Sequence, residues 1–343
     1  MYYYLEEATR TYKDDDWSTV SLFNPKDKTK YDFGTNGDLS ESNSGITAYD
    51  RPAPVTIPLE GYSNSNVTVT IFTDSAMTSQ ELSVAGTISN SAFEVYNLIP
   101  NREYWYSASI GGNAVSSGHF TTTGRRRILK VSDTKYADNA NNCRDLGGLQ
   151  AGDGTLRYNL IFRGSNMDKT TAAEQRIITD YLKVKLDVDL RNSNGSGRND
   201  AKQPITSIGY KHSAFNGWTD LQNSSKIKDV MSAIMTSVCN GEAVYIHCFA
   251  GADRTGYICM LLEAVCGVSE KDCTIDYELT SFSCVGIRDR CSKVKSSYMK
   301  DGLPYIEKYR GNDFQEKATN ILLDAGISQK QIDDFKAAMV KSQ

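Results

Sequence analysis

The residue types and spacing best suited to chemistry occur between positions 247 and 256. This run reads His-Cys-Phe-Ala-Gly-Ala-Asp-Arg-Thr-Gly, so five residues separate Cys248 from Arg254. An apolar, strand-like segment covers 242–246, and an apolar segment with helical character covers 255–265. A loop between a buried strand and a helix gathers unpaired backbone N–H groups at the positive end of the helix dipole, and both features attract an anion.

The cysteine and the arginine give this loop a reactive group and a phosphate clamp. At such a position the pKa of the Cys248 thiol is lowered, so it can act as a thiolate nucleophile. The planar guanidinium of Arg254 can hold two oxygens of one phosphate group. We therefore predict a phosphate site at Cys248 formed by Phe249, Ala250, Gly251, Ala252, Asp253 and Arg254. The alternative is a buried structural cysteine at the end of a strand.

Three further motifs precede this loop and strengthen the interpretation. They are Asn-Asn-Cys-Arg-Asp-Leu-Gly-Gly over 141–148, Leu-Arg-Tyr-Asn-Leu-Ile-Phe-Arg-Gly-Ser over 156–165 and Val-Asp-Leu-Arg over 188–191. The loop matches the His-Cys, five residues, Arg, Ser/Thr signature of protein tyrosine phosphatases. All four motifs together resemble the bacterial tyrosine phosphatase family 3, over roughly residues 140–290.

This resemblance implies phosphomonoester hydrolysis through a phosphocysteine intermediate, without a metal or another cofactor. Cys248 would attack phosphorus, and Arg254 with the loop amides would bind the phosphoryl oxygens. The hydroxyl of Thr255 would hydrogen-bond the thiolate, and His247 would orient the loop.

Two aspartates compete for the role of general acid, which protonates the leaving oxygen. The family resemblance implies Asp253, within the loop itself. Asp220 follows Gly217-Trp218-Thr219 and resembles the mobile Trp-Pro-Asp loop of tyrosine phosphatases, with Thr in place of Pro. The sequence leaves both open.

Four charged residues of the upstream motifs are expected near the site. We predict that Arg144 and Asp145 form a buried ion pair. Asp189 and Arg191 stand where a strand ends, and they either shape the substrate pocket or cap the strand.

Ala252 bears on the substrate, because family members often carry Lys at this position. The absence of this lysine favours an aryl phosphate, such as phosphotyrosine, over a phosphoinositide as the substrate. An inositol phosphate or phosphoinositide phosphatase is the alternative enzyme. A non-catalytic phosphate-binding or adhesion module is the alternative of another class.

The chain is long enough for two domains, and its patterning changes twice. Residues 1–51 form a polar N-terminal arm. Residues 52–124 carry short alternating apolar runs, which predict a small antiparallel β-sandwich. The stretch 98–106 resembles the fibronectin type III pattern, in which Tyr104 would anchor a corner through its hydroxyl, and Trp105 is expected in the core. The basic run 124–127 is expected to be an exposed linker.

Residues 125–343 alternate between strand and helix patterns, which predict a phosphatase-like α/β domain. Strands are expected over 159–162, 184–190 and 242–246, and helices over 171–181, 225–238, 255–266, 314–324 and 328–340. This order predicts a mostly parallel sheet flanked by helices on both faces, with the ligand at the carboxyl ends of its strands.

Composition excludes several other functions. The net charge is −4, and residues 1–124 hold 7 Lys and Arg against 15 Asp and Glu, so nucleic-acid binding is not expected. No apolar run is long enough for a membrane span, and no signal peptide is evident at the first residues. The three histidines form no metal-ligand spacing, although pairs among Cys273, Cys284 and Cys291 could be bridged. A cytoplasmic location and an exported or cell-envelope location with the leader removed both stay open.

Overall fold

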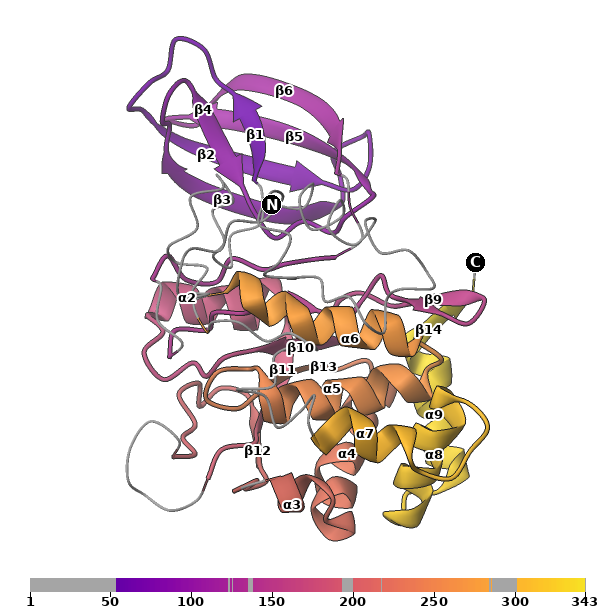
Figure 1. Ribbon diagram of the computed structural model, residues 1–343. Helices are drawn as coiled ribbons and strands as arrows, with labels where there is room; N and C mark the ends of the chain where they lie inside the picture. The colour runs from indigo at the N-terminus through magenta and orange to yellow at the C-terminus, as the bar shows by residue number, and fades with distance from the viewer. Residues whose placement is uncertain are drawn as a thin grey trace, which may run out of the picture.

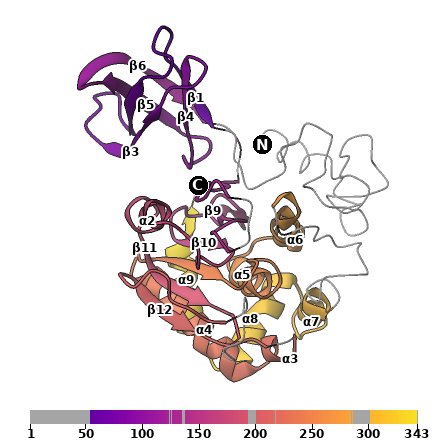
Figure 2. The ribbon, with the colours of Figure 1, turned by 90° about the vertical axis from the view of Figure 1, so that its left-hand side faces the viewer.

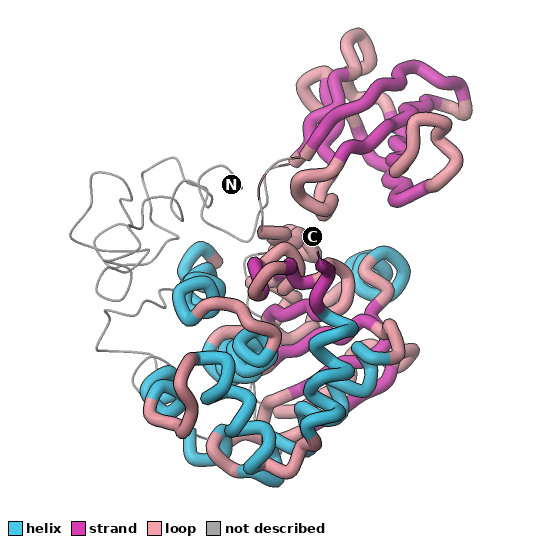
Figure 3. Tube along the Cα trace, turned by 90° about the vertical axis from the view of Figure 1, so that its right-hand side faces the viewer, coloured by secondary structure: helices cyan, strands magenta, loops and turns pink. Residues whose placement is uncertain are grey.

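The computed structural model describes residues 54–122, 124, 126–134, 138–192, 200–216, 218–283, 285 and 301–342. The N-terminal arm expected over 1–51 lies outside these residues. The described residues form an all-β part, drawn from indigo to magenta in Figure 1, and a larger α/β part below it. Figures 2 and 3 show that the all-β part stands off from the α/β part and meets it over a short stretch.

The all-β part is the predicted antiparallel sandwich. One sheet pairs β1 with β4, and the other has the strand order β3-β2-β5-β6. Apolar side chains of both sheets share one core, which holds buried residues of β1, β2, β4 and β5 and partly buried residues of β3 and β6. The strands are β1 (Val55–Pro58), β2 (Asn66–Phe72), β3 (Gln80–Thr87), β4 (Ala92–Val95), β5 (Glu103–Ile110) and β6 (Asn113–Thr121).

The corner expected at Tyr104 is present. Tyr104 is fully buried, and its hydroxyl accepts a hydrogen bond of 3.1 Å from the backbone N–H of Ile99. The prediction for Trp105 is wrong, because neighbouring residues of a strand point to opposite faces. Tyr104 and Tyr106 fill the core, whereas Trp105 is half-buried and does not belong to it.

The α/β part is built on the predicted mostly parallel sheet, with the strand order β12-β11-β13-β10-β7. The first four strands run parallel, and β7 is antiparallel to β10. The strands are β7 (Arg144–Asp145), β10 (Ile161–Gly164), β11 (Val184–Asp189), β12 (Gly209–His212) and β13 (Ala243–His247).

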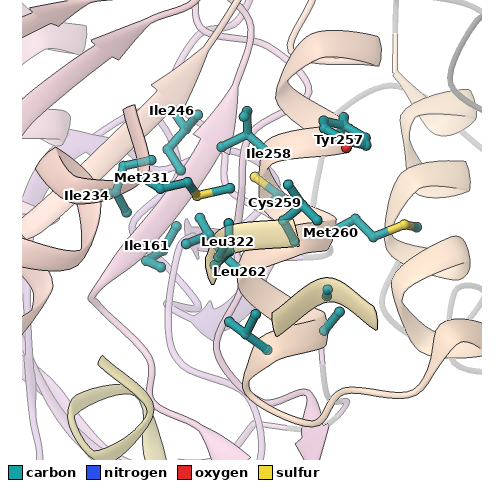
Figure 4. Packing of buried hydrophobic residues seen from close by; sticks show 14 of the residues in the cluster. Ile161, Met231, Ile234, Ile246, Tyr257, Ile258, Cys259, Met260, Leu262 and Leu322 are labelled. Carbon is teal, nitrogen blue, oxygen red and sulfur yellow. The ribbon is translucent and has the colours of Figure 1, made fainter. Parts of the chain in front are cut away.

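Helices cover both faces of this sheet, as expected. On one face, α4 and α5 pack against the strands, α8 packs on α5 and α9 on α4. Figure 4 shows this core, where Ile246 of β13 meets Ile258 of α5 and Met231 of α4. The other face is covered by the π-helical turn η2, which follows α2. The bounds are α2 (Ala172–Arg176), η2 (Ile177–Tyr181), α3 (Trp218–Leu221), α4 (Ser224–Cys239), α5 (Asp253–Val265), α8 (Phe314–Asp324) and α9 (Gln329–Met339).

Several elements of the α/β part were not predicted. Residue Ser269 caps α6 (Glu270–Glu278), which packs on α5 and is followed by η3 (Leu279–Phe282) and later by α7 (Leu303–Glu307). A small antiparallel sheet joins β8 (Gln150–Ala151), β9 (Gly154–Leu156) and β14 (Val340–Ser342). Among the described residues, none of the helices is both long and apolar enough to cross a membrane.

The expectation of an exposed basic linker over 124–127 is also wrong. Arg126 is 8% exposed and Arg127 only 1%, and each lies beside an aspartate. Arg125 lies outside the described residues. These arginines are structural because folding brings carboxylates to them from distant parts of the chain.

Candidate active site

The loop 248–252 joins the end of β13 to the start of α5, at the carboxyl edge of the parallel strands. The last residue of β13, His247, pairs in register with Gly164 of β10 and with Asp189 of β11. Gly251 has a positive φ of 65°, and a Cβ there would lie 2.1 Å from the carbonyl of Gly164. Only glycine allows the loop to pass this close to the neighbouring strand.

Side chains from outside the loop hold its carbonyl groups. The Nδ2 of Asn166 donates to the carbonyl of residue 249 at 2.9 Å. Asn142 Nδ2 donates to the carbonyls of residues 250 and 251, both at 3.2 Å. Arg163 Nη2 donates to those of residues 251 and 252, at 3.0 and 3.3 Å. Because the N–H and C=O of a trans peptide point in opposite directions, the amides of residues 250–253 face the inside of the loop, where they can bind an anion.

One buried carboxylate, that of Asp276, orients the side chains that hold the loop carbonyls. Asp276 of α6 receives Arg144 Nε at 2.9 Å and Arg163 Nη1 at 2.5 Å. Burial alone would raise the pKa of Asp276, but the two guanidinium groups lower it to about 2. Arg144 Nη1 in turn donates to Asn142 Oδ1 at 2.7 Å, which aims the amide of Asn142 at the loop.

The thiol of Cys248 lies at the base of the loop and is 3% exposed. Burial raises its pKa, but the positive charge of Arg254 and the hydroxyl and amide of Thr255 outweigh it, so the net pKa is lowered. The Thr255 hydroxyl is buried and forms no hydrogen bond of standard geometry with the described residues. It is therefore available to donate a hydrogen bond to the sulfur of Cys248. The site therefore favours a thiolate.

The side chain of Arg254 is held at the ends of the neighbouring strands. Its Nη1 donates to three oxygens, which are the carbonyls of Leu190 and Phe215, both at 3.2 Å, and Asn192 Oδ1 at 3.1 Å. The guanidinium is thus oriented by the segments after β11 and β12 as well as by its own helix. A group held this way is preorganised to bind two oxygens of a phosphate.

His247 is buried beneath Cys248. Its Nδ1 lies 3.0 Å from the carbonyl of Cys248, and its Nε2 lies 2.9 Å from Asp187 Oδ1. Burial lowers the pKa of His247, but Asp187 and Asp189 raise it to about 9. An imidazolium at neutral pH is not a general base, and the ring instead links the loop to β11.

The charge of His247 makes stability depend on pH. Its pKa is raised in the folded chain, so the stabilisation is complete below the usual value of 6.5 and is lost as pH rises through about 9. We expect the free energy of unfolding to fall by about 3 kcal/mol over this range. Urea unfolding at pH 6, 7.5 and 9.5 measures the effect. The His247→Gln variant should lack this part of the slope, and an equal slope in both chains would show that His247 is neutral.

Asp189 and Arg191 secure the end of β11. Arg191 donates from Nε and Nη2 to the Asp189 carboxylate, at 2.8 to 3.1 Å, and from Nη1 to Asp168 at 2.7 Å. Burial raises the pKa of Asp189, but His247 and Arg191 lower it to about 2. The pair therefore fixes the turn that presents the Leu190 carbonyl to Arg254.

Comparison with known proteins assigns a family to this arrangement. The family model of the tyrosine phosphatase family matches residues 136–327, more than half of the chain. The chain belongs to the tyrosine phosphatase family. This match spans every segment that supports the loop, from Asn142 to α6.

The individual relatives compared with this chain have low sequence identity to it. A Cupriavidus necator protein named as a tyrosine-protein phosphatase is 27% identical over 166 residues, and the match covers 41% of this chain and 60% of that relative. Pseudomonas aeruginosa TpbA is 13% identical, with a TM-score of 0.33 over 51% of this chain and 91% of that one. The catalytic domain of the Saccharomyces cerevisiae PP-IP phosphatase SIW14 is 16% identical, with a TM-score of 0.32 over 49% and 91%.

The two candidates for the general acid, Asp253 and Asp220, have different surroundings. Asp253 accepts a hydrogen bond of 2.7 Å from the hydroxyl of Tyr277, on α6. Asp220 is paired with Lys226 at 2.9 Å and accepts the backbone N–H of Asn216 at 2.8 Å. Lys226 and this N–H lower the pKa of Asp220, which keeps it ionised.

The prediction that Arg144 and Asp145 pair with each other is wrong. They are neighbours on β7, so their side chains point to opposite faces. Arg144 points toward the loop and binds Asp276, whereas Asp145 points away and binds Arg127 at 3.0 Å.

Sequence reasoning missed the residues that hold the loop carbonyls. Asn142 and Arg163 lie within recognised motifs, but nothing in the sequence showed that they reach residues 250–252 from 88 to 109 positions away. Asn166 follows one of these motifs directly, and Asp276 lies on an unpredicted helix. Arg163 alone had a signal, as a charged residue that directly follows the apolar run 160–162, whereas the segments of Asn142 and Asp276 are polar in sequence.

Among the described residues, the other cysteines form no disulfide bond. These are Cys143, Cys239, Cys259, Cys266 and Cys273, whereas Cys284 and Cys291 lie outside the described residues. Within the part of the chain that the structure describes, His, Cys, Asp and Glu side chains form no group that could hold a metal ion.

Proposed function

We propose that this protein hydrolyses phosphate monoesters in two steps, with Cys248 as the nucleophile. The thiolate attacks phosphorus, an S–P bond forms and the ester P–O bond breaks. Water then attacks the phosphocysteine, the S–P bond breaks, and inorganic phosphate leaves with regeneration of the thiolate. The observation that carries this proposal is a buried thiol at the base of a loop whose carbonyls are held from outside, so that its amides face inward. The lowered pKa of Cys248 supports it.

The loop and Arg254 would stabilise charge on the phosphoryl group. Three equatorial oxygens carry this charge in the transition state, and fixed N–H donors bind it without reorganisation. The outward carbonyls of residues 249–252 support this role, since their hydrogen bonds fix the direction of the amides.

Trapping the intermediate tests the reaction. Wild-type protein mixed briefly with radiolabelled para-nitrophenyl phosphate and quenched in acid should carry label on Cys248. The Cys248→Ser variant should carry none, and its kcat should fall by at least about 10⁴-fold. Steady hydrolysis that persists in Cys248→Ser would contradict the proposal.

Asp253 is proposed as the general acid in the first step and as the base that receives a proton from water in the second. The Tyr277 hydroxyl orients its carboxyl group beside the loop, which supports this role. Asp220 is less suited, because its lowered pKa and its pairing with Lys226 oppose the protonated form.

The effect of Asp253 should depend on the leaving group. We expect Asp253→Asn to lower kcat by about 100- to 1,000-fold on phenyl phosphate, whose phenolate needs a proton. On 2,4-dinitrophenyl phosphate, whose leaving group is stable as an anion, the loss should be less than about fivefold. Asp220→Asn is the matched control and should change neither rate much. If neither variant depends on the leaving group, both assignments fail.

The substrate is proposed to be an aryl phosphate such as phosphotyrosine. Ala252 is fully buried and brings no charge to the loop, so the loop lacks the positive charge that a lysine at this position would offer a polyphosphorylated inositol. A panel of phosphotyrosine peptides, phosphoinositides and phytate measures the preference. A higher kcat/KM for an inositol phosphate would overturn the substrate and leave the reaction intact.

A further inference from the structure

The junction between the sandwich and the α/β part is centred on Asn97, two residues after β4. Its carbonyl oxygen accepts hydrogen bonds from Arg127 Nε at 3.0 Å, Arg127 Nη2 at 2.8 Å and the Tyr181 hydroxyl at 2.8 Å. Its side chain pairs with the backbone of Lys130, with Oδ1 accepting at 2.6 Å and Nδ2 donating at 2.8 Å. Five hydrogen bonds therefore dock the sandwich through one residue.

Arg127 carries this contact into the central sheet. It is 1% exposed, and its Nη1 donates to Asp145 Oδ2 at 3.0 Å and to Asn159 Oδ1. The backbone of 127–129 also pairs along β7, because Arg127 O accepts from Asp145 N at 3.0 Å and Leu129 N donates to Cys143 O at 2.9 Å. Residues 127–129 thus pair with β7 as an additional short strand would.

Strand β7 connects this linker to the candidate active site. Asp145 faces the sandwich junction, and its neighbour Arg144 faces the loop. Arg144 Nη1 donates to the carbonyl and to the Oδ1 of Asn142, at 3.1 and 2.7 Å. Asn142 then holds the carbonyls of residues 250 and 251. A displacement of β7 would therefore change the direction of the loop amides.

A second contact joins the linker to helix α6 through Arg126, which is also buried. Arg126 Nη2 lies 3.7 Å from Asp272 Oδ1, in the first turn of α6. One turn further on, the same helix carries Asp276, which binds Arg144 and Arg163. The two described arginines of the linker, Arg126 and Arg127, thus each pair with an element that positions the loop.

We propose that Arg127 is a positioning residue that couples the docked sandwich to the phosphate loop through β7. The sandwich is then part of the catalytic unit. This proposal rests on the proposed function of the loop, but its effect can be read on the thiol of Cys248 without any turnover.

The test compares variants that loosen the junction without leaving a buried charge. The double variant Arg127→Met with Asp145→Asn removes both charges of the ion pair, so neither is left buried without its partner. Tyr181→Phe is milder, because it removes one hydroxyl at Asn97 and keeps the ring beneath the guanidinium. Arg176→Met, at an exposed position of α2, is the control. Each chain is measured for melting temperature, kcat and KM on para-nitrophenyl phosphate, and the pH dependence of Cys248 alkylation by iodoacetate.

We expect the double variant to lower kcat by about tenfold with KM within about twofold, since misplaced donors lose transition-state binding first. Its alkylation profile should shift to higher pH, and Tyr181→Phe should shift it less in the same direction. A lowered melting temperature with unchanged kcat and alkylation would overturn the proposal and leave Arg127 as a structural anchor. A shifted alkylation profile in a chain that hydrolyses no phosphate ester would support the coupling and contradict the proposed function.

Discussion

Replacing Arg254 with lysine is expected to lower kcat on para-nitrophenyl phosphate by about 1,000-fold, within the range measured for arginines that bind a transferring phosphoryl group. Lysine keeps the positive charge but loses the planar pair of donors that binds two oxygens at once. It also loses the hydrogen bonds to Leu190, Asn192 and Phe215 that hold the guanidinium in place.

A second substitution separates the charge of Arg254 from its geometry. Because this charge lowers the pKa of Cys248, Arg254→Met should move the alkylation profile of the thiol to higher pH, whereas Arg254→Lys should leave it nearly unchanged. The control Arg176→Lys should alter neither alkylation nor kcat. If Arg254→Lys keeps its kcat within tenfold of wild type, the guanidinium does not clamp the phosphoryl group.

Replacing Asp276 with asparagine is expected to reduce the free energy of unfolding by about 3 to 5 kcal/mol, the usual effect of breaking a buried ion pair from one side. The carboxylate lies between Arg144 and Arg163, and all three side chains are at most 3% exposed. Asparagine has nearly the same shape, so the loss comes from two guanidinium groups left in the interior without a counter-charge.

Urea unfolding at neutral pH measures this loss. Asp324→Asn is a suitable control, because Asp324 also pairs with an arginine, Arg310 at 2.6 Å, but both side chains are exposed. That variant should lose much less stability than Asp276→Asn, because water screens an exposed ion pair. Equal effects of the two substitutions would mean that the buried aspartate contributes no more than a surface ion pair.

Patterns local in the sequence led to correct predictions. The apolar strand and helix around 247–256 fixed the loop and its place at the edge of the sheet, as found between β13 and α5. The helix expected over 171–181 begins as α2 after a capping box at Thr171, in which both hydrogen bonds are formed. Such features depend on a few neighbouring residues, and tertiary contacts reinforce them.

Contacts between distant segments could not be predicted in the same way. Helix α6 is polar in sequence, and no apolar period marks it. It is nevertheless buried, with its Asp276 between Arg144 of β7 and Arg163 of β10. The burial of Arg127 likewise depends on Asp145 and Asn97, which only the folded chain brings together. The error over Arg144 and Asp145 is different, since strand alternation alone argues against their pairing.

The pairing of residues 127–129 along β7 also protects the central sheet from other chains. An edge strand with unpaired N–H and C=O groups is a template for intermolecular pairing, and natural sheets cover or shorten such edges. Here the backbone of 143–145 is occupied by the linker. A phosphatase domain shortened to begin after residue 130 would expose this edge, and we expect such a chain to self-associate even where its loop is intact.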